Sequence, residues 1–72
     1  MSTTPTATGP GLSPRQTEVL ALLSEGVRAG AIAVRLGLSE TTVRNHISTI
    51  LRRLECHSQL EAVAVARRCR IL

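Results

Sequence analysis

Residues 32 to 54 read IAVRLGLSETTVRNHISTILRRL, and this stretch decides the fold. A short segment with apolar residues at helical spacing leads to Gly37, and a longer one of the same kind follows. Gly37 can adopt the left-handed conformation that ends a helix, Leu38 can fold back onto that helix, and the Ser39 hydroxyl can cap the next one. The stretch therefore predicts two helices joined at a fixed angle by a tight turn, which is a helix-turn-helix.

The second helix of this unit, expected over residues 40 to 54, has two chemically different faces. One face is apolar and needs a core, and it consists of Val43, Ile47, Ile50, Leu51 and Leu54. The opposite face carries hydroxyl, guanidinium and amide groups on Thr41, Arg44, Asn45, Ser48 and Arg52. Such groups hydrogen-bond to base edges and phosphates in a DNA major groove, although a merely solvated helix face has the same pattern. The capped turn before this helix favours DNA.

The composition favours duplex DNA over other nucleic acids. The 72-residue chain has a formal net charge of +4, all of its basic residues are Arg, and it contains no Phe, Tyr or Trp. Arg suits bidentate contact with phosphate or guanine. Folds that bind RNA or single strands usually stack bases on aromatic side chains, which this chain lacks. The chain also has no Asp, so a phosphate-accepting aspartate of the receiver type would have to lie in another domain or chain.

The sequence indicates neither an enzyme nor a cofactor or metal site. It has no phosphate-binding loop, and the spacing of His46, Cys56, His57 and Cys69 matches no zinc pattern. No apolar run approaches the roughly 18 residues that span a bilayer, and the chain does not begin like a signal peptide. We therefore expect a cytoplasmic, non-enzymatic protein in which Cys56 and Cys69 are reduced core or interface thiols.

The chain divides into a tail, residues 1 to 11, and one small domain, residues 12 to 72. The tail is rich in Thr, Pro and Gly and is expected to be flexible and disordered. A helix should follow Ser13, because a proline occupies the first helical position and Gln16 completes a capping box, and Gly26 should end it. Its buried side is expected to consist of Val19, Leu20, Leu22 and Leu23.

The next helix, expected over residues 29 to 36, is the least well specified. Arg28 occupies the place where a Ser or Thr cap would be expected, and Gly30 lies in the first turn, where glycine weakens a helix. The side chains that this helix should present to the core are Ile32, Ala33 and Leu36.

The last helix should begin at a second full capping box, Ser58 with Glu61, and run to about Cys69. Apolar residues lie almost all the way round it. A terminal helix packs on a small core by one side only, so its other apolar side needs a partner, of which a second copy is the simplest. Alternatively, the alanines only favour helix formation, and one broad core contact is shared by Leu60, Val63 and Val65.

Together these residues resemble the LuxR-type (GerE-type) helix-turn-helix domain of bacterial transcription regulators. The similarity covers Leu12 to Leu72 and rests on motifs at fixed spacing, namely LSPRQTEVL at 12–20, EG at 25–26, IA at 32–33, RLGLSE at 35–40, TVRNHI at 42–47, ILRRL at 50–54 and AV at 62–63. The resemblance implies an all-α, four-helix domain. Its third helix would enter the major groove, and its fourth would form a two-fold dimer on an inverted-repeat operator.

The resemblance also implies roles for individual positions. The positions that match base contacts are Arg44, Asn45 and Ser48. Phosphate contacts are expected from Arg28, Ser39, Thr41, Thr42, His46 and Arg52. Among these, Ser39 is first of all a helix cap, and a structural role is the more common alternative for His46. The dimer interface is expected to consist of Leu60, Val63, Ala64 and Arg67.

Several positions depart from the family pattern. Arg28 stands where the family usually has Ser or Thr, so its guanidinium would have to replace the lost cap and phosphate contact. Thr41 stands where Lys is common, which removes a cation from the groove side and should lower the salt dependence. Val34 replaces a frequent Glu and leaves an outward apolar strip with Gly30 and Ala31. This strip is either a patch for another protein or a set of ordinary exposed residues.

We therefore predict a sequence-specific, dimeric transcription regulator that reads double-stranded DNA with the helix over residues 40 to 54. An alternative from another class is a protein-interaction module that docks on RNA polymerase or titrates a larger LuxR-type regulator into inactive dimers. Such a module would depend on Val63 or Val65 and not on Arg44 and Asn45.

Overall fold

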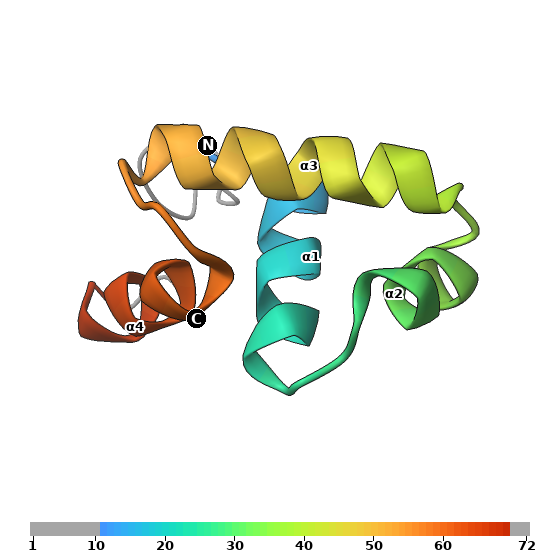
Figure 1. Ribbon diagram of the computed structural model, residues 1–72, viewed down its shortest axis with the longest axis horizontal. Coiled ribbons are helices and arrows are strands. Elements are labelled where there is room, and N and C mark those ends of the chain that lie inside the picture. The colour runs from blue at the N-terminus through green and yellow to red at the C-terminus, as the bar shows by residue number, and fades with distance from the viewer. Residues whose placement is uncertain (1–10, 70–72) are drawn as a thin grey trace, which may run out of the picture.

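The computed structural model describes residues 11–69, which form four helices: α1 (Pro14–Ser24), α2 (Ala29–Leu36), α3 (Glu40–Arg53) and α4 (Gln59–Arg68). Within this range there is no strand, which confirms the all-α, four-helix fold. In Figure 1, α3 lies across the top of the molecule, with α1 below its centre and α2 and α4 below its two ends. None of the described helices is long and apolar enough to cross a membrane. The predicted tail, apart from Gly11, lies outside the described residues.

Serine side chains cap three of the four helices. The Ser13 hydroxyl accepts a hydrogen bond from the Gln16 N–H over 3.1 Å, and the Gln16 side chain accepts one from the Ser13 N–H over 3.0 Å. This confirms the capping box predicted for α1. Ser39 accepts a bond from the Thr42 N–H over 3.0 Å at the start of α3. Arg28 makes no such side-chain bond at the start of α2, which confirms that this helix is weakly capped.

The start of α4 differs from the prediction. The Ser58 hydroxyl accepts a hydrogen bond from the Glu61 N–H over 3.1 Å, so the cap itself is present. The Glu61 carboxylate, however, accepts from the N–H of His57 over 2.8 Å instead of returning to Ser58. Ser58 has a φ of −150°, compared with −76° for Ser13, so its N–H points in another direction relative to the helix. The prediction of a second full capping box is therefore wrong.

The helices α1, α2 and α3 end in the same hydrogen-bonded turn, the Schellman motif. After α2, Gly37 is left-handed with a φ of 68°, and the Leu38 N–H bonds to the Ala33 carbonyl over 2.9 Å. Gly26 holds the equivalent position after α1, as predicted, and Glu55 holds it after α3. Glu55, with a φ of 57°, is the one non-glycine residue of positive φ in the range 11–69. This conformation is strained for a residue that has a Cβ.

The core takes one face from each helix and includes the segment before α1. The predicted apolar stripe of α3 is buried, except that Leu51 is only half-buried. Leu22, Leu23 and Leu36 are also half-buried and pack against the core. The buried residues are Leu12, Val19, Leu20, Ile32, Ala33, Val43, Ile47, Ile50, Leu54, Cys56, Ala62 and Ala66.

Two arginine side chains join segments that lie far apart in the sequence. Arg53, at the end of α3, donates to the carbonyl of Gly11 over 2.7 Å. Arg67, in the last turn of α4, donates to the carbonyl of Ser24 at the end of α1 over 3.2 Å. These bonds attach the chain before α1 to α3 and the end of α4 to α1.

Candidate nucleic-acid interface

The outward face of α3 carries the side chains predicted to contact bases. Val43, Ile47 and Ile50 are buried on the opposite face, so the core fixes the rotation of the helix about its axis. His46 is half-buried between the two faces. The helix repeat therefore places together the exposed side chains of Arg44, Asn45 and Ser48, with Thr41 before them and Arg52 after them.

In the turn before α3, the hydroxyl groups of Ser39 and Thr42 are hydrogen-bonded to each other. Besides accepting from the Thr42 N–H, the Ser39 hydroxyl donates to Oγ1 of Thr42 over 2.9 Å. The Ser39 proton is thus used within the turn, whereas the Thr42 hydroxyl is an acceptor in this pair and keeps its own proton for another acceptor. Of these two predicted phosphate contacts, Thr42 is therefore the better donor and Ser39 is the helix cap.

Arg44 is held by an acidic side chain one turn earlier on α3. Oε2 of Glu40 accepts from Nε of Arg44 over 3.1 Å and from Nη2 over 2.5 Å. Both side chains are well exposed, 67% for Arg44 and 50% for Glu40. Exposed pairs of this kind add less than about 1 kcal/mol to the stability of a fold. The pair was not predicted, although a Glu four residues before an Arg is visible in the sequence.

Two further arginines are predicted to contact phosphate, one just before α2 and one at the end of α3. Arg28 is exposed at the start of α2, and Arg52 is exposed in the last turn of α3, with Nη2 3.5 Å from Oγ1 of Thr49. The start of α2 lies beside the start of α3, because Oε1 of Glu40 is 3.4 Å from the position of a Cβ built on Gly30. The backbone at Arg28 therefore lies near the start of α3, and Arg52 lies in the last turn of α3.

The side of α4 that faces away from the core exposes residues predicted to form a dimer. Leu60 is 84% exposed, Ala64 is exposed and Val63 is half-buried. The exposure of Leu60 contradicts its part in the alternative of one broad core contact, whereas Val63 and Val65 do pack against the core beside the buried alanines of α4. Arg67 is exposed as well, although its guanidinium also reaches α1.

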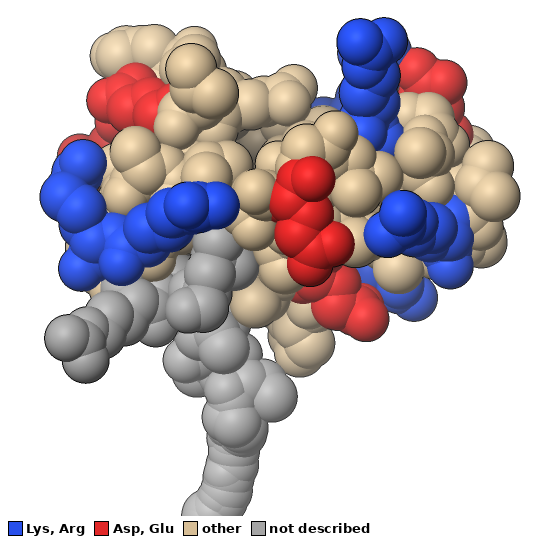
Figure 2. All heavy atoms as spheres, turned by 90° about the horizontal axis from the view of Figure 1, so that it is seen from below, with Lys and Arg blue, Asp and Glu red and all other residues tan. Residues whose placement is uncertain are grey.

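The face turned away from α3 has a mixed charge. Figure 2 views the molecule from below, and its basic side chains stand in separate groups with acidic ones between them. One ion pair on α1 joins Arg15 and Glu18, with 3.3 Å between Nη1 and Oε1. This face therefore carries both signs of charge and forms no single basic surface in this view.

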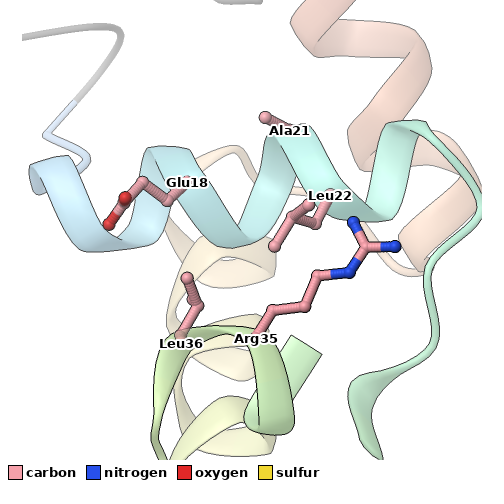
Figure 3. A pocket seen from close by; sticks show the side chains of 5 residues that line it. All are labelled: Glu18, Ala21, Leu22, Arg35 and Leu36. Atoms are coloured by element: carbon pink, nitrogen blue, oxygen red, sulfur yellow. The ribbon is translucent and has the colours of Figure 1, made fainter. Parts of the chain in front are cut away.

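A shallow pocket of about 300 Å³ lies between α1 and α2. Figure 3 shows Leu22 and Leu36 pointing into the space between these helices, with Arg35 running beside Leu22. Apart from Glu18 and Arg35, the lining is aliphatic and contains no nucleophile, so this pocket offers no catalytic arrangement. Across residues 11–69, no group of three or more His, Cys, Asp or Glu side chains is placed to hold a metal ion.

The two cysteines have different surroundings, and both are free thiols. Cys56 is buried, and its Sγ donates to the carbonyl of Leu54 over 3.4 Å. Burial raises the pKa of the Cys56 thiol, the charge of Glu61 raises it further, and Arg68 lowers it. Cys69 is exposed at the end of α4, so only Cys56 is a core thiol, and a role of Cys69 in an interface stays a prediction.

Two helices joined by a fixed turn, the second with one buried face and one face of donors and acceptors, define a helix-turn-helix domain. The chain belongs to the LuxR family: the family described as "Bacterial regulatory proteins, luxR family" matches residues 10–66. This match confirms the resemblance inferred from the sequence, and the four helices are the helix-turn-helix domain of this family.

Similar proteins include regulators from several bacteria. The transcriptional regulatory protein DesR of Bacillus subtilis (strain 168) is 42% identical over 52 residues, which cover 72% of this chain and 26% of DesR. The nitrate/nitrite response regulator protein NarL of Escherichia coli (strain K12) is 35% identical over 51 residues, covering 71% of this chain and 24% of NarL. The crystal structure of the response regulator ChrA from a heme-sensing two-component system has a TM-score of 0.83 and 30% identity, covering 93% of this chain and 34% of ChrA. The chain thus spans about a quarter to a third of the length of these proteins.

Proposed function

We propose that this domain binds double-stranded DNA in a sequence-specific way and that α3 lies in the major groove. The observation that carries this proposal is the division of α3 into a buried apolar face and an exposed face of hydrogen-bonding groups, held in place by the capped turn before it. On this proposal, the side chains that reach base edges are Arg44, Asn45 and Ser48. An Arg guanidinium suits guanine and an Asn amide suits adenine in the major groove.

The phosphate contacts in this proposal lie around the same face. Arg28 and Thr42 would contact one stretch of backbone beside the start of α3, and Arg52 would contact backbone near its end. Ser39, Thr41 and His46 are further candidates for phosphate contacts: Ser39 also caps α3, Thr41 is exposed and His46 is half-buried. With few cations free for phosphate, we expect a shallow dependence of DNA affinity on salt.

We also propose that two copies associate through α4 when they bind an inverted repeat. Leu60 exposes more than four fifths of its surface, exposed Ala64 lies on the same side of α4, and Val63, which is half-buried against the core, borders them. A two-fold axis would bury this side against its own copy, with Arg67 at the rim. Burying an exposed leucine in this way contributes about 1.5–3 kcal/mol per copy.

Selection of bound sequences from a random pool of DNA duplexes tests the proposed function. We expect enrichment of an inverted repeat, because base contacts give the sequence preference and the two-fold dimer gives the symmetry. Enrichment of an unpaired half-site would support base reading and reject the dimer. A pool that stays random would reject DNA reading and would favour the protein-interaction alternative, in which the apolar side of α4 docks on RNA polymerase or on a larger regulator.

The substitution Leu60→Glu should separate the two copies without unfolding the domain. It places a charge on each side of the proposed two-fold contact, and we expect the dissociation constant of the dimer on DNA to rise at least about tenfold, or ~1.4 kcal/mol. Binding of a single half-site should change little. Sedimentation and gel-shift titrations with a whole operator and a half-operator measure the two effects.

Val34→Glu is the matched control for this change. Val34 is 82% exposed on α2, far from α4, so the same charge there should leave the dimer intact. If Leu60→Glu and Val34→Glu bound the whole operator with the same affinity, a dimer through α4 would be ruled out.

A further inference from the structure

The contact between Glu40 and Arg44 uses one particular edge of the guanidinium group. An Arg side chain has five N–H donors, one on Nε and two on each terminal nitrogen. Glu40 accepts from Nε and from Nη2, which are the donors along the side of the group. The end of the group, where Nη1 and Nη2 each direct an N–H outward, is left available. This end forms a fork that matches two acceptors side by side, such as O6 and N7 of guanine.

The carboxylate of Glu40 is itself placed from two directions. It belongs to the first residue of α3, where a negative charge interacts favourably with the helix dipole. Its Oε2 bonds Arg44, while Oε1 lies beside Gly30 in the first turn of α2. That turn begins without a side-chain cap, so its N–H groups also favour a nearby negative charge. The carboxylate therefore lies between the first turn of α2 and the guanidinium of Arg44.

We infer that Glu40 is a positioning residue that sets the preference of Arg44 for guanine. The inference rests on the proposed function, because it takes Arg44 as a base contact. Glu40 holds the long Arg side chain in one conformation before DNA arrives, with the fork of Nη1 and Nη2 free for the base edge. The free-energy cost of ordering the flexible Arg44 side chain is then already met in the free protein. This cost therefore no longer reduces the affinity for the correct base.

A second effect follows from the charge of Glu40. Paired with this carboxylate, Arg44 contributes little net positive charge to the interface, so it adds less to binding of any DNA backbone than a free Arg would. The pair therefore raises the preference for one base pair relative to the affinity for all sequences. A purely structural acid at the start of α3 would change the stability of the domain and not this preference.

The test measures the DNA affinity of the Glu40→Gln variant and of the wild-type chain. Both are titrated with the operator selected from the random pool and with versions of it in which each of the other bases stands at the position that Arg44 reads. We expect the preference for guanine to fall roughly 2- to 5-fold, because an exposed pair offsets only part of the cost of ordering one long side chain. The slope of log affinity against log salt should steepen by about one, because an uncompensated cation then faces the DNA.

Glu18→Gln is the matched control. It breaks the exposed pair with Arg15 on α1, away from the polar face of α3, and should change neither the preference nor the salt slope. Thermal unfolding of both variants verifies that each is folded under the binding conditions. The variant Arg44→Ala provides the background for a double-mutant cycle, in which Glu40→Gln should no longer alter the preference.

The outcomes separate this inference from the proposed function. If the wild-type chain selects a guanine that depends on Arg44, and Glu40→Gln keeps or sharpens that preference, Glu40 does not position Arg44 although DNA reading stands. If Glu40→Gln lowered the preference for guanine equally in the wild-type chain and in the Arg44→Ala background, the inference would also be overturned. Glu40 would then act independently of Arg44. If the wild-type chain selects no sequence at all, the proposed function fails, and the inference fails with it.

Discussion

Replacing Ile50 with alanine is expected to lower the free energy of unfolding by about 2–5 kcal/mol. Ile50 is fully buried in the C-terminal half of α3, the helix that packs on both α1 and α4. Removing its side chain leaves a cavity that the surrounding residues fill only in part. A domain of this size has a total stability of roughly 3–9 kcal/mol, so the loss is a large share of it. Thermal or urea unfolding followed by circular dichroism measures the change, and the midpoint should fall by at least about 10 °C.

The matched control for this prediction is Val34→Ala on α2. Val34 is 82% exposed, and its truncation should change the stability by no more than about 0.5 kcal/mol. If Ile50→Ala were no more destabilising than Val34→Ala, the burial of the apolar face of α3 would be refuted. The orientation of its polar face, on which the proposed function depends, would then be refuted as well.

The parts of the fold that depend on neighbours in the sequence were predictable. The capping box of Ser13 and Gln16, the left-handed glycine after α2 and the buried stripe of α3 each depend on residues a few positions apart, and the structure confirms them. The bounds of α2 also agree with the prediction, even though its cap is missing. Local spacing settles these features because a helix brings residues three and four apart to the same side.

Other features depend on details that residue types do not reveal. The sequence pattern at Ser58 and Glu61 matches a capping box, but the backbone angle at Ser58 directs the carboxylate to His57. The left-handed conformation at Glu55 was missed because a glycine would normally mark such a position. The apolar residues of α4 lie all the way round, so the pattern could not tell that alanines face the core and that Leu60 is exposed.

The candidate site shows the same limit. Which residues of α3 face outward followed from its periodicity, because the core fixes its rotation. The hydrogen-bond partners of each side chain could not be predicted from this periodicity. The bond of Arg53 to the carbonyl of Gly11 joins positions 42 residues apart, which no local pattern reveals. The pair of Glu40 and Arg44 has a visible spacing, but i,i+4 pairs are common on solvated helices, and only the structure shows that the carboxylate also lies beside α2.

Replacing Arg44 with alanine is expected to weaken binding to the selected operator by about 1–3 kcal/mol and to abolish the preference at one base pair. The loss should concentrate on that base pair, because the guanidinium is held by Glu40 and offers its free fork to one base edge. Binding to a duplex of unrelated sequence should change less. Gel-shift titrations at a fixed salt concentration, on the operator and on its single-base variants, measure each part of this effect.

Arg15→Ala is the control for this prediction, since Arg15 is also an exposed arginine paired with a glutamate, but on α1. It should leave both affinity and preference unchanged. Removing Arg44 alone leaves the Glu40 carboxylate unpaired near the DNA, which by itself weakens binding to any sequence. The double variant Glu40→Gln with Arg44→Ala removes this repulsion, so a loss of preference that persists in the double variant belongs to the missing guanidinium. If affinity instead falls equally for all sequences in both variants, Arg44 contacts phosphate, and base reading must rest on Asn45 and Ser48.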